Sequence, residues 1–200
     1  MRAERSPLRN DPRSPQFQEY RSVMIINHKK FTDAIRRAGL SEEQVAAAID
    51  RPGLNATSAV RNWRRGDFRP RPKPDDLRRL ASALGVAPQD IVKYDGSYKW
   101  ARMSPTKVKL VTDLIRGKDV NTALNLLAFS KKRAAVAVKK ALQTAIASAE
   151  NNEVDVATLQ VTESYVGSGP TLKRFQPKDR GRAHQILKRT SHIVVAVEAA

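Results

Sequence analysis

The sequence predicts an α+β protein in which a small helical region precedes a larger region that ends in a long β-hairpin. Apolar residues recur at helical spacing through most of residues 25–95. From about residue 97 the pattern changes to one strand, three helices and two β-type runs. A chain of 200 residues suffices for one medium domain or two small ones. We therefore expect a small all-α domain at residues 25–95 and an α+β domain at residues 97–200.

The net charge of +17 points to a polyanionic partner, because so large an excess of one sign repels itself. Nucleic acid is the first candidate and an anionic membrane surface the second. No stretch is long and apolar enough to span a bilayer, and the first residues lack the apolar core of a secretory signal. Because cysteine is absent, neither disulfides nor thiolate metal sites are expected. These features predict a soluble cytoplasmic protein that does not enter membranes.

The residues that would carry catalysis or hold a metal are not grouped in the sequence. No nucleophile stands beside a base, no motif pairs two carboxylates, and no glycine loop has phosphate-binding spacing. His28, His184 and His192 are far apart, and surface or nucleic-acid contacts explain them better than metal ligation does. We expect neither an enzyme nor a cofactor nor a metal site.

The helical region is bounded by two stretches without periodicity. Residues 1–24 are rich in Arg, Pro and Ser, which predicts a disordered basic tail. Asp-Gly is a turn signal, so "YDGSY" at residues 94–98 is expected to join the two domains. Between these limits, Gly39 is a plausible end of a first helix, and Ser41 begins a second with Gln44 as its capping-box partner.

Three motifs of the helical region, "GLSEEQVA", "AVRNWRRG" and "PKPDDLRRLASALGV", resemble the phage-repressor-like helix-turn-helix family over about residues 28–93. The resemblance implies that the helix ending near Trp63 enters the major groove of DNA. One departure is "DRPGLNATSA", which is longer than the usual turn of that family. Contacts to DNA or mRNA would come from five arginines, Arg61, Arg64, Arg65, Arg69 and Arg71. The alternative is a small helical domain with a solvated basic face.

The second region begins with a short strand, "SYKWARMS", which is followed by three helices. Ser104 and Pro105 form a strong helix start, because Ser caps the helix and Pro fits its first turn. This helix is expected to bury one broad face, formed by Val108, Val111, Leu114 and Ile115. The longest helix, after Ser130, has an alanine-rich stripe that suits close packing and includes Leu142 and Ile146.

The two β-type runs surround "GPTLKRFQPKDRGRAHQILKR" at residues 169–189, which contain seven Lys or Arg and one Asp. Apolar alternation supports strands near Leu159 and again near Ile193, but it fails further out on both faces. A lone two-stranded ribbon is only marginally stable in water, so the hairpin at about residues 158–198 needs a brace outside the domain. Its basic side chains make nucleic acid the obvious brace.

Four motifs of the second region, "ARMSPTKVKLVTDLIRGK", "ALQTAIASAENN", "GPTLKRFQPKDRGRA" and "ILKRTSHI", are similar in order and spacing to the bacterial ribosomal large-subunit protein twenty-two family. The resemblance covers about residues 97–198. It implies three helices packed on a three-stranded antiparallel sheet, with a long hairpin that penetrates large-subunit ribosomal RNA and lines the nascent-peptide exit tunnel. The implied partners are this RNA, neighbouring large-subunit ribosomal proteins and the nascent polypeptide. The implied role is in subunit assembly and translation on the cytoplasmic ribosome.

The family motifs place the expected RNA contacts on three segments. They are Arg102, Ser104, Lys107 and Lys109 at the strand-to-helix junction, Lys173, Arg174, Lys178, Arg180, Arg182, Lys188 and Arg189 along the hairpin, and Thr190, Ser191 and His192 at its base. The tip residues that would lie against the tunnel wall are Phe175, Gln176, Pro177, Asp179 and Gly181. Asp179 departs from the family, which usually has a small neutral residue there. A structural ribosomal RNA-binding protein is the leading hypothesis, and a DNA-binding transcriptional regulator that uses the helix-turn-helix is the alternative.

Overall fold

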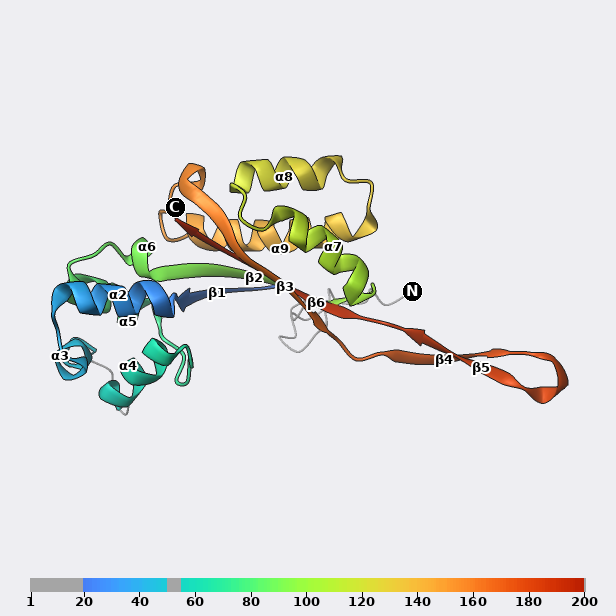
Figure 1. The fold of residues 1–200 in the computed structure, drawn as a ribbon, viewed down its shortest axis with the longest axis horizontal. Helices are drawn as coiled ribbons and strands as arrows, with labels where there is room; N and C mark the ends of the chain where they lie inside the picture. Colours follow the sequence, from blue (N-terminus) through green and yellow to red (C-terminus); the bar gives the residue numbers. More distant parts are fainter. Residues whose placement is uncertain (1–19, 50–54, 200) are drawn as a thin grey trace, which may run out of the picture.

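A computed structural model describes residues 20–49 and 55–199 and has a four-stranded antiparallel sheet at the centre of the body (Figure 1). In spatial order the strands are β1 (Tyr20–Ile26), β2 (Val92–Ala101), β6 (Ser191–Ala199) and β3 (Leu159–Ser168). Strand β2 lies between β1 and β6 and pairs with both. Segments from the beginning, the middle and the end of the chain therefore meet in one sheet.

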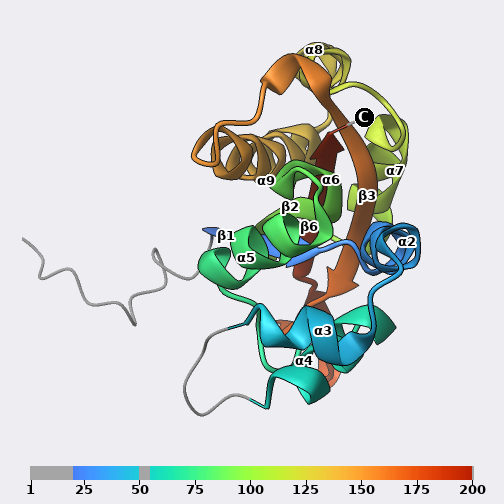
Figure 2. The ribbon, with the colours of Figure 1, turned by 90° about the vertical axis from the view of Figure 1, so that its left-hand side faces the viewer.

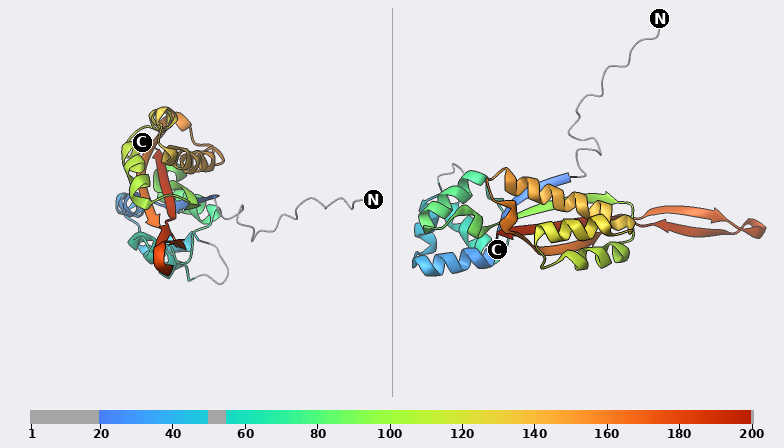
Figure 3. Two further views of the ribbon diagram at one scale, coloured as in Figure 1. Left: turned by 90° about the vertical axis from the view of Figure 1, so that its right-hand side faces the viewer. Right: turned by 90° about the horizontal axis from the view of Figure 1, so that it is seen from above.

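Three helices cover one face of this sheet, namely α7 (Pro105–Ile115), α8 (Val120–Phe129) and α9 (Arg133–Glu150) (Figures 1 and 3). Helix α9 packs along β2 and β6, α7 packs on β3, and α8 packs on α9. The approach of α9 is close, because a Cβ placed on Gly96 would lie 2.0 Å from the carbonyl oxygen of Ala141. Leu142, which belongs to α9, is fully buried. The close packing predicted from the alanine-rich stripe is confirmed.

Five short helices form a bundle at the end of the body opposite the hairpin (Figures 1 and 2). They are α2 (His28–Ala38), α3 (Glu42–Ala47), α4 (Ala56–Arg65), α5 (Pro74–Leu84) and α6 (Pro88–Ile91). The predicted local signals are confirmed: Gly39 ends α2 with φ 64°, and Ser41 and Gln44 form a capping box. Buried residues of the bundle, such as Phe31 and Trp63, belong to the same apolar core as those of the sheet.

Predictions at the join of the two regions require correction. Asp95 and Gly96 do not form a turn, because both lie inside β2. A glycine is needed at position 96 because α9 approaches the strand closely there, and not because the chain turns. Most of the predicted tail lies outside the described residues, but from Tyr20 the chain is strand β1. The sheet accordingly has four strands where the family resemblance implies three. On α7, Leu114 is 46 % exposed and does not join the predicted buried face.

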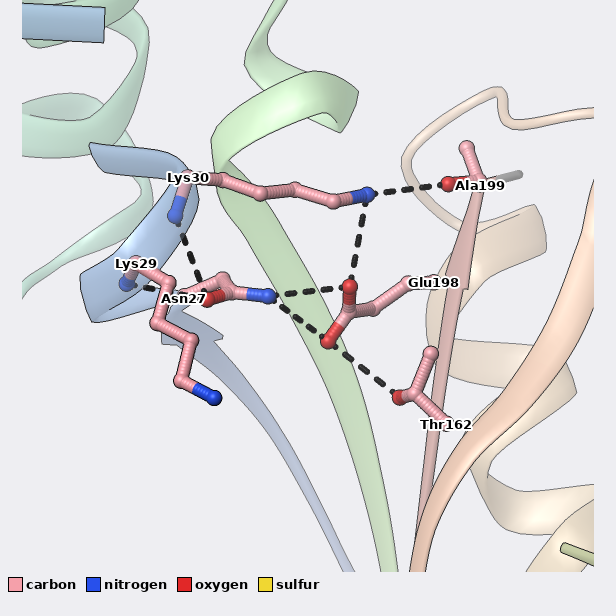
Figure 4. Close-up of polar contacts among 6 residues, drawn as sticks. All are labelled: Asn27, Lys29, Lys30, Thr162, Glu198 and Ala199. Carbon is pink, nitrogen blue, oxygen red and sulfur yellow. Dashed lines mark hydrogen bonds and ion pairs between the residues drawn. The ribbon is translucent and has the colours of Figure 1, made fainter. Parts of the chain in front are cut away.

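A partly buried polar cluster joins the first helix of the bundle to the last strand of the sheet (Figure 4). Asn27 caps α2 with its side-chain oxygen and donates from Nδ2 to both carboxylate oxygens of Glu198, each at 2.9 Å. The Thr162 hydroxyl donates to the same carboxylate at 3.2 Å. Lys30 Nζ lies 3.3 Å from Glu198 and donates to the carbonyl oxygen of Ala199 at 3.1 Å. Because Glu198 is only 4 % exposed, these partners replace water around its charge and fix the bundle against the sheet.

Candidate nucleic-acid interface

The chain between β3 and β6 leaves the body as a separate ladder, which we call the arm (residues 169–189) (Figure 3). Its strands β4 (Leu172–Pro177) and β5 (Ala183–Lys188) form a two-stranded sheet in which every residue is exposed. The arm separates from the body at Gly169, where a Cβ would lie 2.4 Å from the hydroxyl oxygen of Thr190. The predicted projecting hairpin is present, and its strands are interrupted at this point instead of running on from β3.

The basic side chains of the arm point to both of its faces and have no acidic partner within the described part of the chain. Lys173 pairs in register with Leu187 and the next residue, Arg174, with Ile186, so successive side chains alternate between the faces. Within the described residues, none of the seven Lys and Arg side chains of the arm forms an ion pair; they are Lys173, Arg174, Lys178, Arg180, Arg182, Lys188 and Arg189. Such a concentration of one sign raises the free energy of the isolated arm, and a phosphate backbone would lower it.

A short 3-10 turn, η2 (Asp179–Gly181), closes the tip of the arm. Arg180 and Gly181 both have left-handed backbone conformations, with φ of 53° and 69°. The carbonyl oxygen of Asp179 accepts from the N–H of Arg182 at 3.1 Å, whereas its carboxylate forms no ion pair with any described residue. Phe175 is 74 % exposed near the tip, and Gln176 and Pro177 beside it are also exposed. The predicted tip residues are therefore grouped at the far end of the molecule.

Of the three polar residues predicted to contact RNA at the base of the arm, Thr190 and His192 form hydrogen bonds within the chain. Thr190 and Ser191 are buried, and the Thr190 hydroxyl donates to the carbonyl oxygen of Pro170 at 2.6 Å. Nδ1 of His192 accepts from the N–H of Trp100 at 3.2 Å. Burial limits the access of an outside partner to Thr190 and Ser191, although Thr190 lines one of the hollows at the base of the arm, so their contact with RNA stays a prediction.

Three shallow hollows surround the base of the arm, and Arg102 lines all of them. Side chains from β2, α7, α9 and the arm meet there, which gives what we call the arm-base surface. Its basic members are Arg102, Lys107, Lys132, Arg133, Lys140, Lys188 and Arg189. Helices α7 and α9 both begin at this surface without a side-chain cap, so the cap predicted for the Ser104 side chain is not formed. The first N–H groups of both helices therefore add to the attraction of the surface for anions.

The sequence predicted only part of this surface. Arg102, Ser104 and Lys107 line the hollows as expected, whereas Lys109 is exposed on α7 and lies outside them. Sequence reasoning missed the basic residues at the start of α9, chiefly its N-cap Lys132 and its first residue Arg133. The available signal was the run "KKR" at residues 131–133, which stands directly before a long helix. Its significance depends on the topology, because only the fold brings the start of α9 to the base of the arm.

At the other end of the molecule, two of the five predicted N-terminal contacts are held by an acidic residue. Nη1 of Arg64 lies 2.6 Å from one carboxylate oxygen of Glu42, and Nε of Arg61 lies 3.3 Å from the other. Partial burial raises the pKa of Glu42, but the two guanidinium groups outweigh that effect and lower the pKa overall. These two arginines therefore have an internal partner, unlike the cations of the arm.

The other three predicted contacts, Arg65, Arg69 and Arg71, lie at the last residue of α4 and in the loop that follows it. Arg65 and Arg69 are exposed, and Arg71 lies close enough to Asp95 to affect its pKa. Trp63 is fully buried and donates from Nε1 to the carbonyl oxygen of Pro70 at 2.6 Å. The indole thus anchors α4 to the loop after it. The unusual segment before α4 lies mostly outside the described residues.

Within the described residues, no helix has the length and apolar character needed to cross a membrane. The same part of the chain has no group of three or more His, Asp or Glu side chains that could hold a metal ion.

An α+β body with an exposed basic arm is typical of proteins that bind nucleic acid. Residues 97–198 match the family described as Ribosomal protein L22p/L17e, and the chain belongs to this family. The chain is 59 % identical to the large ribosomal subunit protein uL22 of Magnetococcus marinus over 100 residues, which cover 50 % of this chain and 88 % of the relative. It is 56 % identical to the protein of the same name from Clostridium acetobutylicum over 101 residues, which cover 50 % of this chain and 91 % of the relative.

The chain is accordingly a structural constituent of the ribosome, and its family is not enzymatic. The match begins at residue 97 and leaves the helical bundle outside it. Neither the helix-turn-helix resemblance nor a regulatory role derived from it has support from these comparisons. Strand β2 begins at Val92, before the matched region, so the added segment extends a strand of the family domain.

Proposed function

We propose that the body and arm bind large-subunit ribosomal RNA, assist assembly of the subunit, and place the tip of the arm in the wall of the nascent-peptide exit tunnel. The observation that carries this proposal is the arm, an exposed two-stranded ladder whose basic residues have no acidic partner among the described residues. The proposal places the protein on the cytoplasmic ribosome, with that RNA and neighbouring large-subunit proteins as its partners.

The energetics of the arm favour an RNA partner over an apolar one. A two-stranded ribbon that buries no face gains little from the hydrophobic effect, so its order has to be supported from outside. Lys and Arg gain free energy from phosphates through the release of counterions, and this gain needs no exact register. The arm-base surface continues the positive charge onto the body, beside the first turns of α7 and α9.

The tip is proposed to contact the tunnel wall and the nascent polypeptide. Phe175 is strongly exposed and uncharged, and Gly181 and the 3-10 turn give the tip a narrow profile. Asp179, the single acidic residue of the arm, would lower the positive charge locally, which weakens RNA contact at that point.

For the helical bundle we propose phosphate contacts with RNA at the subunit surface, in place of base recognition in DNA or mRNA. Arg65 and Arg69 are exposed, whereas Arg61 and Arg64 are oriented by Glu42. The cluster around Glu198 holds the bundle to the sheet, so binding of the arm to RNA also fixes the position of the bundle on the subunit.

The RNA proposal is tested by substituting Lys173, Arg174 and Arg182 with Gln in the full chain. Affinity for a large-subunit rRNA fragment should fall, and the slope of log affinity against log salt should decrease by roughly 2 to 3. A matched control replaces Arg37, Arg78 and Lys118, which are exposed on other elements. Equal losses in both variants, or no loss in either, would contradict a specific role for the arm.

The tunnel proposal is tested separately with a photoreactive amino acid in place of Phe175. Ribosomes that carry this variant and are stalled on a nascent chain should give a crosslink between the two. The same probe at Lys118 on the body is the control, and crosslinks of equal yield from both positions would contradict the placement of the tip.

The bundle proposal is tested with Arg65 and Arg69 replaced by Gln. Retention of the protein on large subunits in high-salt washes should decrease modestly, because two phosphate contacts are lost. A preference for one DNA or mRNA sequence over random sequence at matched salt would instead favour base recognition.

A further inference from the structure

Trp100 is directed outward at the base of the arm by an irregularity in strand β2. The register of β2 against β6 shifts between Tyr98 and Ala101, so that β2 has one more residue than its partner there. β-Bulges of this kind redirect a side chain from its regular position. Trp100 is 43 % exposed and has φ 62°, a left-handed conformation that is strained for a bulky residue. Strain of this kind is found preferentially at functional positions.

His192 holds the indole of Trp100 in this outward position. The two rings form an edge-to-face pair with centroids 4.7 Å apart and an interplanar angle of 81°. The backbone N–H of Trp100 also donates to Nδ1 of His192 at 3.2 Å. The ring pair orients the indole, and the hydrogen bond fixes the backbone that carries it, so Trp100 loses little further freedom when it binds a ligand.

Trp100 shares its hollow with an aromatic side chain of its own strand and with basic side chains from the following segment and from α9. Tyr98 and Arg102 come from β2 and the residue after it, and Arg133 and Lys140 come from α9. RNA-binding proteins recognise unpaired nucleotides with this combination, since the base stacks on an aromatic ring and the phosphates meet cations. Cations alone would suit any polyanion, whereas an exposed indole among them is suited to a base.

We propose that this hollow binds one unpaired nucleotide of RNA, with the base stacked on Trp100 and the adjacent phosphates on Arg102 and Arg133. The inference rests on the proposed RNA binding of the arm and adds a distinct site to it. The cations of the arm suit the backbone of any RNA helix or strand. The hollow requires a base that has left its stack, and so it would select a single-stranded or bulged position where the arm leaves the body.

The proposal is tested by tryptophan fluorescence of the full chain and of Trp100→Phe. Trp63 is fully buried, so the difference between the two emission signals reports on Trp100. A single-stranded RNA oligonucleotide should quench this difference signal, and the same oligonucleotide in a perfect duplex should quench it much less. Inorganic polyphosphate should compete for binding without quenching. Equal quenching by polyphosphate, or no quenching by single-stranded RNA, overturns the proposal.

Affinity measurements give a second, independent test. Trp100→Gly should weaken binding of the single strand by roughly 5- to 150-fold, the range of one lost base stack, whereas Trp100→Phe keeps a ring and should bind nearly as tightly as the parent chain. Glycine adopts φ 62° readily, so the unfolding temperature should change little, and Trp100→Asn is a second variant that tolerates this conformation. Loss of affinity only in parallel with a lower unfolding temperature in both variants overturns the proposal.

The arm variant used above separates the two ideas. If substitution of Lys173, Arg174 and Arg182 weakens RNA binding while Trp100→Gly does not, the nucleotide site is wrong and the function of the arm stands. If the arm variant binds as tightly as the parent chain, the proposed function itself fails.

Discussion

The two ends of strand β6 are surrounded by charge in opposite ways. Near its last residue, Glu198 is 4 % exposed and is bound by Asn27, Lys30 and Thr162. Before its first residue, the chain runs through the arm, whose cations have no acidic partner among the described residues. The first end is complete within the chain, because its charges are compensated there. The second end has no countercharge within the described residues, which supports the proposed RNA contact at the arm.

The largest expected effect comes from reversing charge on the arm. Arg174→Glu together with Arg182→Glu changes four units of charge and should reduce association with large subunits by more than roughly a hundredfold. The thermal unfolding transition of the isolated protein should not shift, because neither side chain packs on the body. Subunit association is measured by co-sedimentation and unfolding by calorimetry. A lower unfolding temperature would show that these arm residues stabilise the isolated protein, which would contradict the proposed difference between the two ends of β6.

The opposite pattern is expected for Gly96→Ala, which adds a methyl group inside the body. The new Cβ would lie 2.0 Å from a backbone oxygen of α9, so the helix has to shift, at a cost of about 2–3 kcal/mol in the free energy of unfolding. Gly167→Ala is the matched control on β3, where the nearest atom would be at an ordinary 3.7 Å. Denaturant unfolding measures both, and equal losses would show that α9 does not press on β2 at this point.

How far the sequence predicts this molecule depends on whether the signal is local. Helix ends such as Gly39 and Ser41 were predictable, because a cap is decided within a few residues. The arm was predictable from its composition, because seven cations in 21 residues exclude burial. Strand β1 was not predictable, because its position depends on pairing with residues far along the chain, from Tyr20 with Tyr98 to Ile26 with Val92. Asp95-Gly96 carries a turn signal, and tertiary packing overrides it.

The candidate site divides along the same line. Basic residues of the arm could be assigned from sequence, because nearly every side chain there is exposed. At the base of the arm, the burial of Ser191 and the position of Arg133 of α9 beside β2 depend on the three-dimensional arrangement. Trp100 gave no sequence signal of its own, since its orientation arises from a bulge in the pairing of β2 with β6.

The completed end of β6 is tested by Asn27→Asp. Aspartate still caps α2, but it removes the amide donor and places a second carboxylate beside buried Glu198, so stability should fall by about 2 kcal/mol. Glu198→Gln in the same chain should restore most of the loss, because the like charges are then gone. Asn27→Ser, which keeps a cap and adds no charge, is the control. If Asp and Ser destabilise the protein equally, the cluster is not held by charge.

The smallest effect concerns Asp95, an acidic residue of β2 at the junction between the bundle and the sheet. Burial, together with the nearby Glu163, raises its pKa from 3.8 to about 6, against the opposing effects of Lys93 and Arg71. The folded state therefore binds the proton of the Asp95 carboxyl more tightly than the unfolded state does. The contribution of protonated Asp95 to the free energy of unfolding is full below about pH 4 and is lost as the pH rises through 6. Asp95→Asn cannot ionise, so it should match the parent chain at pH 4. Raising the pKa from 3.8 to about 6 corresponds to about 3 kcal/mol, and solvent screening of this only partly buried residue reduces the expected advantage of Asp95→Asn at pH 7 to roughly 1 kcal/mol. Thermal unfolding across this range measures the difference, and Asp113→Asn, which changes an exposed residue paired with Arg116, is the matched control. A constant difference from pH 4 to pH 7 would mean that Asp95 is ionised throughout and that its charge is compensated as well as that of Glu198.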